Sequence, residues 1–275
     1  ATYKRAYLIF RDIDRLNAII NNSRFPVQII FSGKAHPDDR PGQRLIEDVY
    51  KISQHKELAG KIVFLNGYDM IIAKYLISGT DVWLNTPRKP LEASGTSGQK
   101  AAVNGVINLS VLDGWWPEGY SSDNGWAIGD EKGSLSEGEQ DKRDADELYK
   151  ILEEKIIPMY YERDENDVPH RWIKMMKNSI ENITPTFSSH RMVKDYTENF
   201  YIPASEMGIQ LGLKNYAKAK ELSEWKLWMK ENWKYIKIVN INKRIEEIGG
   251  EPFAELIITG DLGPISPSDV SVEVC

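Results

Sequence analysis

The sequence is poor in cysteine, since Cys275 is the only one among 275 residues. A single thiol excludes a disulfide within the chain and is typical of a reducing compartment, so we expect the protein in the cytoplasm. Basic residues are also in the minority: 35 Lys and Arg stand against 41 Asp and Glu, giving a formal net charge of −6. Because binding to a phosphate backbone needs a concentrated basic surface, this balance argues against nucleic acid as a partner.

Long apolar runs and clusters of metal ligands are missing as well. No run of about 18 apolar residues occurs, so we expect no membrane-spanning segment. The histidines are scattered along the chain and predict no metal site: they are His36, His55, His170 and His190. With 41% hydrophobic and 28% charged residues, the composition is that of a folded globular chain.

The two ends of the chain predict a piece of a longer protein. Ala1 is not preceded by an initiator Met, and the first residues contain no signal-type segment. At the other end Val270, Val272 and Val274 alternate as in a β-strand, which is not stable alone in water.

The first 112 residues alternate between helical and strand-like patterns. Helices are predicted over 5–22, 42–58, 69–77 and 98–104. Near-continuous apolar runs predict buried strands over 26–32, 61–66, 81–85 and 106–112. Such strands, separated by helices, are typical of a parallel sheet covered on both faces. The sequence therefore predicts a doubly wound α/β domain.

The second half has a different character. Residues 113–147 are rich in Gly, Ser, Asp and Glu and predict a long loop region, in which the charge run from Asp130 to Asp146 predicts a solvated loop and helix start. Further helices are predicted over about 145–164, 170–182 and 189–200, with two more between 214 and 246. Residues 262–275 predict a linker and a first strand.

The segment from Lys89 to Gly105 carries the most chemical information. It predicts a strand end, a loop of small residues and a helix that starts near Gly98. Backbone N–H groups of such a loop, together with a helix N-terminus, bind anions, so Gly95, Thr96, Ser97 and Gly98 form a candidate phosphate cradle. It is not a Walker A loop, because Gly98 is followed by Gln-Lys-Ala.

Lys100 is predicted in the first turn of that helix. A cation there opposes the helix dipole unless its amine is neutral or faces an anion. A lysine with a depressed pKa in such a pocket is of the type that forms Schiff bases, so attachment of pyridoxal phosphate and a solvent-facing lysine are both open.

The residues around Lys100 resemble a known family. The segment Glu92-Ala-Ser-Gly-Thr-Ser-Gly-Gln-Lys100-Ala-Ala-Val-Asn-Gly105 closely resembles the cofactor-lysine segment of the α-glucan (glycogen, starch and maltodextrin) phosphorylases. Two segments that follow resemble the bacterial and archaeal branch: Leu112-Asp-Gly-Trp-Trp-Pro-Glu-Gly-Tyr120 and Asn124-Gly-Trp-Ala-Ile-Gly129. Shorter segments agree in order: Tyr3-Lys4-Arg5, Gly33-Lys34-Ala35, Phe64-Leu-Asn-Gly-Tyr68 and Phe187-Ser-Ser-His-Arg191. The resemblance covers roughly residues 1–200.

The resemblance implies a role for each matching residue. Lys100 matches the lysine that holds pyridoxal 5′-phosphate covalently as a Schiff base, Tyr68 a tyrosine lining the cofactor ring, and Lys4 a catalytic lysine that contacts the substrate phosphate. The cofactor phosphate would be surrounded by the loop of Gly95, Thr96 and Ser97. The hydroxyls of the transferred glucose would be contacted by Glu92, Ala93, Ser94 and Gly95. Simpler readings stay open: Glu92 capping the loop, Tyr68 in the core, and Lys4 as an exposed terminal lysine.

The implied reaction converts α-1,4-glucan and inorganic phosphate into a shortened glucan and α-glucose 1-phosphate with retention. In this family the cofactor phosphate lies beside inorganic phosphate and relays protons. Two phosphates repel each other by about 4 kcal/mol per pair of unit charges at 4 Å and an effective dielectric near 20. The site therefore needs cations and helix-terminal N–H groups together.

The resemblance also implies a fold and a division of the chain. The chain would be a C-terminal fragment with most of the second Rossmann-like domain of a two-domain GT-B glycosyltransferase, followed by helices. We expect this domain over 1–202 without its first strand, a helical segment over 203–260, and a linker with the start of an absent β domain over 261–275. Its partner would be the missing N-terminal domain of the same protein, and homo-oligomers are possible.

Three departures from the family pattern bear on function. The arginine that clamps the substrate phosphate would precede Ala1, so the separated chain is predicted to be inactive. Asp69 follows Tyr68 where animal enzymes carry a basic residue, which puts cofactor contacts there in doubt, and Ser97 replaces a glycine.

Two other functions remain open. A nucleotide-sugar-dependent glucan glycosyltransferase would share the fold but would not need a Schiff-base lysine at Lys100. A non-catalytic carbohydrate-binding module would use aromatic rings that suit pyranose stacking, although packing in the core explains them more simply: Trp115, Trp116, Tyr120 and Trp126.

Overall fold

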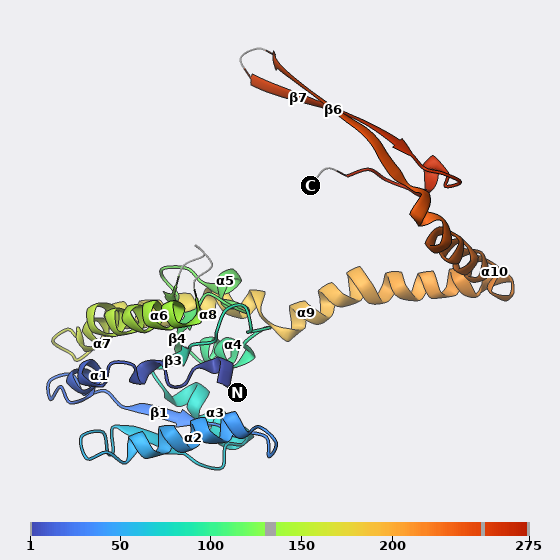
Figure 1. Cartoon of the computed structure of the whole chain (residues 1–275). Helices are drawn as coiled ribbons and strands as arrows, with labels where there is room; N and C mark the ends of the chain where they lie inside the picture. The colour runs from blue at the N-terminus through green and yellow to red at the C-terminus, as the bar shows by residue number, and fades with distance from the viewer. Residues whose placement is uncertain (1, 130–135, 249–250, 274–275) are drawn as a thin grey trace. The chain divides into compact units, whose positions relative to one another are not determined.

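The computed structural model describes residues 2–129, 136–248 and 251–273. The chain divides into two compact units, 1–192 and 193–275. Figure 1 follows the chain from blue to red. The predicted division at residues 202 and 260 stays a prediction.

Short parallel strands form the centre of the first unit. One sheet pairs β1 (Ile29–Ser32) with β2 (Ile62–Leu65), and a second sheet has the order β3 (Val82–Asn85), β4 (Ile107–Val111), β5 (Gly125–Ile128). All neighbours are parallel: Ile29 is level with Ile62, Val82 with Ile107, and Asn108 with Gly125. The four strands predicted from apolar runs are confirmed within a few residues.

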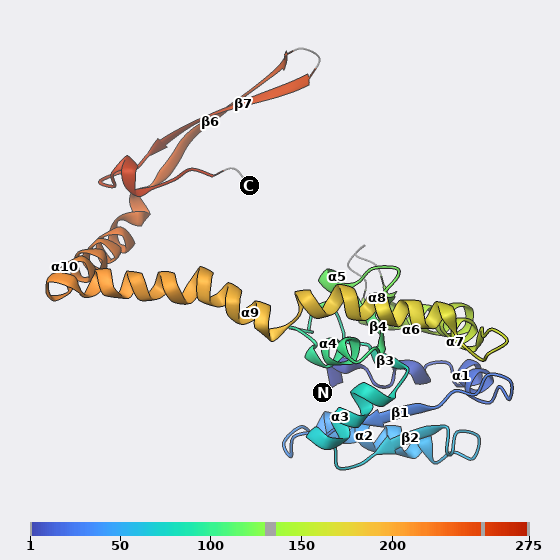
Figure 2. The same ribbon diagram turned by 180° about the vertical axis from the view of Figure 1, so that it is seen from behind.

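Helices separate these strands along the chain. They are α1 (Ile13–Ile20), α2 (Arg40–Ser53), α3 (Met70–Gly79), α4 (Thr96–Val103), α5 (Trp116–Gly119), α6 (Glu137–Ile151), α7 (Ile157–Tyr161) and α8 (His170–Thr186). A π-helical segment, η3 (Leu152–Ile156), joins α6 to α7, and the 3-10 helices η1 (Thr2–Lys4) and η2 (Leu8–Phe10) precede α1. Figure 2 shows the same arrangement from behind.

Strand β4 is buried along its whole length. Ile107, Leu109 and Val111 belong to the main core, which also takes in Leu148 of α6. The intervening Asn108 points toward α4, because its Nδ2 donates to the carbonyl of Gly98 at 3.0 Å. Since successive side chains of a strand point to opposite faces, β4 is covered on both of them, as expected for a parallel strand.

The region predicted as a long loop, 113–147, is more ordered than expected. It contains α5 and β5, and α6 begins at Glu137 rather than near residue 145. Ser136 caps α6 in a capping box with Glu139, which explains this start. Residues 130–135 of the predicted charge run lie outside the described residues.

The second unit contains the rest of the helices and a hairpin. Helix α9 (Ser189–Tyr196), in which the division between the units falls, leads through the π-helical η4 (Thr197–Tyr201) into α10 (Ile202–Asn232), which η5 (Trp233–Tyr235) follows. The backbone of α10 is not helical from Leu213 to Tyr216. β6 (Lys237–Ile248) and β7 (Glu251–Asp261) pair antiparallel, so the helix predicted to reach residue 246 is wrong beyond η5. Residues 262–273 contain the 3-10 helix η6 (Pro267–Asp269) but not the strand predicted from the alternating valines; Val274 is not described.

Candidate active site

Lys4 and Glu92 form an ion pair at the carboxyl end of β3. The Lys4 Nζ donates to the Glu92 carboxylate and to Oδ1 of Asn85, the last residue of β3, at 3.2 Å. The Glu92 side chain is only 6% exposed, whereas that of Lys4 is 36% exposed. Two residues 88 positions apart, both predicted in the site, are therefore brought together.

Backbone contacts hold Lys4 in this position. The Thr86 hydroxyl donates to the carbonyl of Lys4 at 2.9 Å, and the N–H of Arg88 donates to the carbonyl of Tyr3 at 2.7 Å. These bonds tie residues 3–4 to the segment that leaves β3. Lys4 is therefore a fixed part of the site and not a free terminal lysine.

The next residue, Arg5, anchors this arrangement in the interior. Its guanidinium donates to Asp141 at 2.8 Å and Asp144 at 2.7 Å, and to the carbonyls of Thr86 and Pro87. Both aspartates are buried, so the prediction of a solvated charge run is wrong for them. A buried arginine needs such partners because an unpaired charge in the interior is very costly.

Asp141 is also bonded by Tyr7 at 2.8 Å and by Arg88 at 2.9 Å. Burial alone would raise the pKa of Asp141, but the hydrogen bonds from Arg5, Tyr7 and Arg88 outweigh it and lower that pKa. The carboxylate therefore stays ionised and links helix α6 to residues 5–7 and to Arg88.

Two hydrogen bonds fix the loop from Glu92 to Gly95. The Glu92 N–H donates to Oδ2 of Asp113 at 2.8 Å, and the Trp115 N–H donates to the carbonyl of Ser94 at 2.8 Å. Asp113 follows β4, so two strand ends cooperate in placing the loop. Asp113 had no assigned role in the sequence, and Trp115 was named only among the rings of a possible carbohydrate-binding module; only their closeness to the carboxyl end of a predicted strand could have indicated their role in placing this loop.

Helix α4 begins directly after this loop. Gly95 is the N-cap in a left-handed conformation with φ of 95°, and no side chain caps the helix. The first N–H groups of a helix have no acceptor inside it, so those of Thr96 and Ser97 suit an anion such as a phosphate. The helix starts at Thr96 and not near Gly98 as predicted.

Lys100 therefore lies in the last turn of α4 and not in the first, and its side chain is exposed. The opposition between a first-turn cation and the helix dipole, inferred from the sequence, does not arise.

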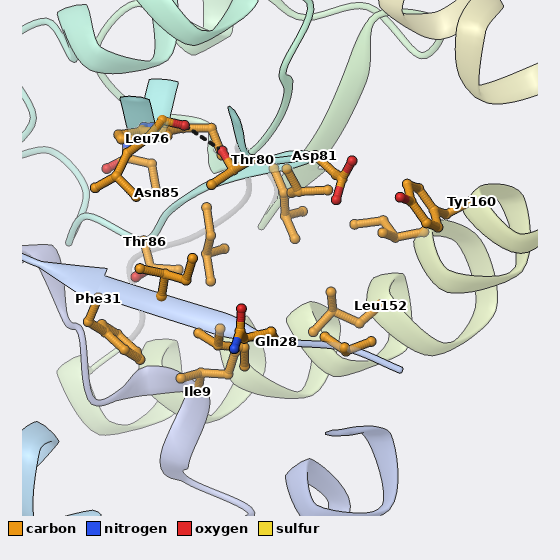
Figure 3. A pocket seen from close by; sticks show the side chains of 18 of the residues that line it. Ile9, Gln28, Phe31, Leu76, Thr80, Asp81, Asn85, Thr86, Leu152 and Tyr160 are labelled. Carbon is orange, nitrogen blue, oxygen red and sulfur yellow. Dashed lines mark hydrogen bonds between the residues drawn. The ribbon is translucent and has the colours of Figure 1, made fainter. Parts of the chain in front are cut away.

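Tyr68 follows β2 and is half-buried. Together with Lys4 and Ser97 it lines a cavity of about 690 Å³ (Figure 3), which Lys100 does not line. The neighbouring Asp69 accepts the Ile72 N–H at 2.8 Å and so caps α3. The carboxylate of Asp69 is therefore engaged by its own helix.

The pKa of Tyr3 reports the electrostatics of the site. Burial raises it above 10.0, and the negative charge of Glu92 and a hydrogen bond to that carboxylate raise it further. The Glu92 carboxylate, the Lys4 ammonium group and the free N–H groups at the start of α4 thus all follow or adjoin the carboxyl end of β3. Together they can hold hydroxyls and an anion.

The aromatic residues offered as a sugar-stacking surface lie in the core. Trp115, Trp116 and Trp126 are buried, and Trp116 donates its indole N–H to the carbonyl of Trp126 at 3.2 Å. These three rings therefore do not form the exposed stacking surface that a carbohydrate-binding module would need. Among the described residues no group of three metal-ligating side chains occurs, and no helix has the length and apolarity needed to cross a bilayer.

Parallel strands separated by helices define an α/β protein, and Lys4, Asn85 and Glu92 meet at the carboxyl end of β3. The family model described as "Phosphorylase: Carbohydrate phosphorylase" matches residues 1–154. The chain belongs to the carbohydrate phosphorylase family.

The names of similar proteins agree with this family. The chain is 47% identical over 274 residues to the maltodextrin phosphorylase of Thermococcus litoralis, covering 100% of this chain and 32% of the relative. It is 53% identical over 199 residues to the glycogen phosphorylase of Aquifex aeolicus (72% and 28% covered), and 38% identical over 279 residues to that of Mycobacterium tuberculosis (99% and 32% covered). The chain therefore spans about a third of the length of these relatives.

Proposed function

We propose that the chain is part of a pyridoxal-phosphate-dependent α-1,4-glucan phosphorylase that forms α-glucose 1-phosphate with retention. The observation that carries this proposal is the Lys4–Glu92 pair beside the uncapped N-terminus of α4. Membership of the carbohydrate phosphorylase family favours it over a nucleotide-sugar-dependent transferase.

Each residue then has a task that its position supports. Lys4 neutralises the substrate phosphate, because its ammonium is partly exposed and held by Asn85 and Glu92. Glu92 accepts hydrogen bonds from glucose hydroxyls, and the exposed Ala93 and Ser94 with Gly95 contribute backbone groups. The Asp113 and Trp115 bonds keep this loop in one conformation, which reduces the entropy lost when the sugar binds.

The donor set also fits the cofactor. The free N–H groups of Thr96 and Ser97 suit its phosphate, the exposed amine of Lys100 on the same helix is accessible for attachment, and Tyr68 offers a ring in the cavity lining. When bound, pyridoxal phosphate supplies a phosphate that exchanges protons with the substrate phosphate. The N–H groups of Thr96 and Ser97 would hold that phosphate.

The remaining features of the proposal concern the whole protein. We infer a doubly wound Rossmann-like domain in a GT-B arrangement, cytoplasmic location, and an active site completed by an N-terminal domain outside these 275 residues. The isolated chain is then inactive, because the cleft wall and the phosphate-clamping arginine are not part of it.

A chimaera tests the function. Residues 1–275 replace the matching third of the Thermococcus litoralis maltodextrin phosphorylase, and release of glucose 1-phosphate from maltodextrin and phosphate is measured. We expect activity from the chimaera, none from the isolated chain, and a loss of at least a hundredfold with Lys100→Met. The matched control is Lys142→Met, an exposed lysine on α6 that leaves activity unchanged.

The cofactor is tested on the same chimaera by borohydride reduction and peptide mapping. A pyridoxyl label on Lys100 supports the proposal. An unlabelled Lys100 peptide, or an active Lys100→Met variant, contradicts it, and glucose 1-phosphate released by the isolated chain contradicts the predicted inactivity.

A further inference from the structure

Asn108 is a buried polar residue of β4. The strand is buried along its whole length, and Asn108 is only 1% exposed. Its Nδ2 donates to the carbonyl of Gly98 at 3.0 Å, but its Oδ1 has no hydrogen-bond partner among the described residues. Asn is rare in strands, and a buried amide oxygen without a partner destabilises the fold. Packing of the core therefore does not explain this residue, whereas its contact with α4 does.

The bond from Asn108 belongs to a pair of bonds that hold the start of α4 by its carbonyl groups. No side chain caps this helix. Instead the Trp115 N–H donates to the carbonyl of Ser94 at 2.8 Å, just before the helix. Asn108 donates to the carbonyl of Gly98, in the first turn. A capping side chain would occupy N–H groups of this turn, whereas bonds to its carbonyls fix the turn and leave those N–H groups available.

The same turn lies directly against two side chains. A Cβ at Gly98 would lie 2.6 Å from Oδ1 of Asn108 and 3.0 Å from Nε1 of Trp115. A Cβ at Gly95 would lie 3.0 Å from Cδ1 of Trp115. Glycine allows this close approach of the backbone because it has no Cβ. Trp115 is itself 4% exposed and packs edge-on against Phe187, with ring centroids 5.0 Å apart, so the surface below the turn is rigid.

Asn108 is also mounted on a rigid element. In the sheet it is level with Trp83 of β3 and with Gly125 of β5, so parallel ladders hold its backbone on both sides. Groups on such an element keep their direction better than groups on a loop. The amide of Asn108 therefore transfers the fixed position of β4 to the first turn of α4.

We propose that Asn108 is a positioning residue of a phosphate site at the start of α4, with Trp115 as its second support. By holding the turn through its carbonyls, the two residues keep the N–H groups of Thr96 and Ser97 aligned for a phosphate monoester. Donors that are already aligned lose less entropy when the anion binds, so the anion binds more tightly. The inference rests on the proposed function, which assigns this turn to the cofactor phosphate, and adds two residues that contact the turn without using its free N–H groups.

Inorganic phosphate tests the positioning without the cofactor. The chain is titrated with phosphate, and the amide resonances of Thr96 and Ser97 give the Kd. Asn108→Leu keeps a side chain of similar volume and removes the amide, so the Kd should rise by about fivefold or more, as expected for the loss of one aligning hydrogen bond. The matched control is Asn104→Leu, which should leave the Kd unchanged. Asn104 donates its Nδ2 to the carbonyl of Lys100 at 2.7 Å, at the other end of α4.

The cofactor separates positioning from a general effect on stability. The chimaera with the Thermococcus litoralis enzyme is freed of cofactor, and its affinities for pyridoxal 5′-phosphate and for pyridoxal, which lacks the phosphate, are compared. Asn108→Leu should weaken binding of the phosphate form by about fivefold or more and leave that of pyridoxal unchanged. A residue that only stabilises the fold would change both affinities alike or neither.

Four results overturn the proposal. They are no phosphate-dependent shift at the start of α4 in the natural chain, an unchanged Kd in Asn108→Leu, an equal rise of the Kd in Asn104→Leu, and equal weakening of both forms of the cofactor. If Asn108→Leu does not fold, Gly98→Ala replaces it with the same expected changes, because its Cβ displaces Oδ1 of Asn108.

Failure of the proposed function gives a different result. An unlabelled Lys100 peptide after borohydride reduction, together with a phosphate Kd that rises in Asn108→Leu and not in Asn104→Leu, contradicts the cofactor and supports the positioned phosphate site.

Discussion

The guanidinium of Arg5 donates to the carboxylate of Asp144 at 2.7 Å, and both side chains are only 1% exposed. This pair joins the residue next to Lys4 to helix α6, 139 positions along the chain. Since Arg5 also bonds Asp141 and the carbonyls of Thr86 and Pro87, it fixes the backbone from which Lys4 reaches Glu92. The position of a candidate catalytic residue thus depends on a buried ion network behind it.

Replacing Arg5 with methionine should strongly destabilise the first unit. The substitution leaves Asp141 and Asp144 buried without their main counter-charge, which typically costs about 3–5 kcal/mol. Urea unfolding followed by tryptophan fluorescence measures the change in the free energy of unfolding. The matched control is Arg15→Met: Arg15 pairs with Glu153 at 2.6 Å on the surface, where a pair contributes no more than about 1 kcal/mol. Equal losses in the two variants would contradict a buried network at Arg5.

Acid should weaken the same network through Asp141. Its pKa in the folded protein is below the ordinary value of 3.8, so its ionisation contributes stability that is complete above that value. As the pH falls below about 3.8 and through the lower folded pKa, this contribution is lost. We expect the stability difference between the natural chain and Asp141→Asn to narrow below pH 4 in urea titrations. Asp146→Asn, which removes an exposed carboxylate of α6, should show no such narrowing, and a constant gap for Asp141→Asn would refute the assignment.

The strands of the first unit could be predicted where apolar residues run together. Val27 to Phe31 and Ile62 to Leu65 are such runs, and β1 and β2 form there. β5 was missed because Trp126 and Ile128 are separated by one small residue within a glycine-rich region. Its pairing with β4 supplies the stabilisation that its own sequence does not indicate.

The local sequence pattern also failed to predict the structure of the charged regions. Asp141 and Asp144 lie on the same face of α6 as the buried Ala145, Leu148 and Tyr149, because these residues recur at spacings of three and four. This spacing was the feature of the sequence that could have predicted the burial of both aspartates. Helix was predicted as far as residue 246, which includes most of β6, although Ile238, Ile241 and Ile245 stand there among polar residues.

The candidate site was predictable as a set of residues but not as an arrangement. The resemblance identified Lys4 and Glu92 separately, whereas their pairing depends on the fold. The start of α4 at Thr96 could not be read from small residues that suit a loop and a helix equally.

The negative charge of Glu92 should be measurable at Tyr3. Burial, then the charge of Glu92 and a hydrogen bond to it, raise the pKa of the Tyr3 hydroxyl. Glu92→Gln removes the charge but not the burial, so the pKa of Tyr3 should fall and still stay above 10.0. An NMR titration with labelled tyrosine, assigned by a Tyr3→Phe variant, measures this shift. Glu118→Gln changes an exposed carboxylate and should leave Tyr3 unaffected; a Tyr3 pKa that does not move in Glu92→Gln would exclude the contact.

Two glycines beside the loop should be intolerant of a methyl group. A Cβ at Gly114, where φ is 59°, would lie 2.4 Å from the carbonyl oxygen of Ser94, and a Cβ at Gly98 would lie 2.6 Å from Oδ1 of the buried Asn108. Neither neighbour is the end of a long flexible chain, so overpacking should cost about 1–3 kcal/mol in each alanine variant. Gly114→Ala should in addition shift the amide resonances of residues 92–95, because the Trp115–Ser94 hydrogen bond has to move. Gly138→Ala in α6 meets no atom within 4 Å and should stabilise the chain by up to about 1 kcal/mol, because it restricts the unfolded state. If Gly114→Ala and Gly138→Ala unfold at the same urea concentration, the close approach of residue 114 to the loop is wrong.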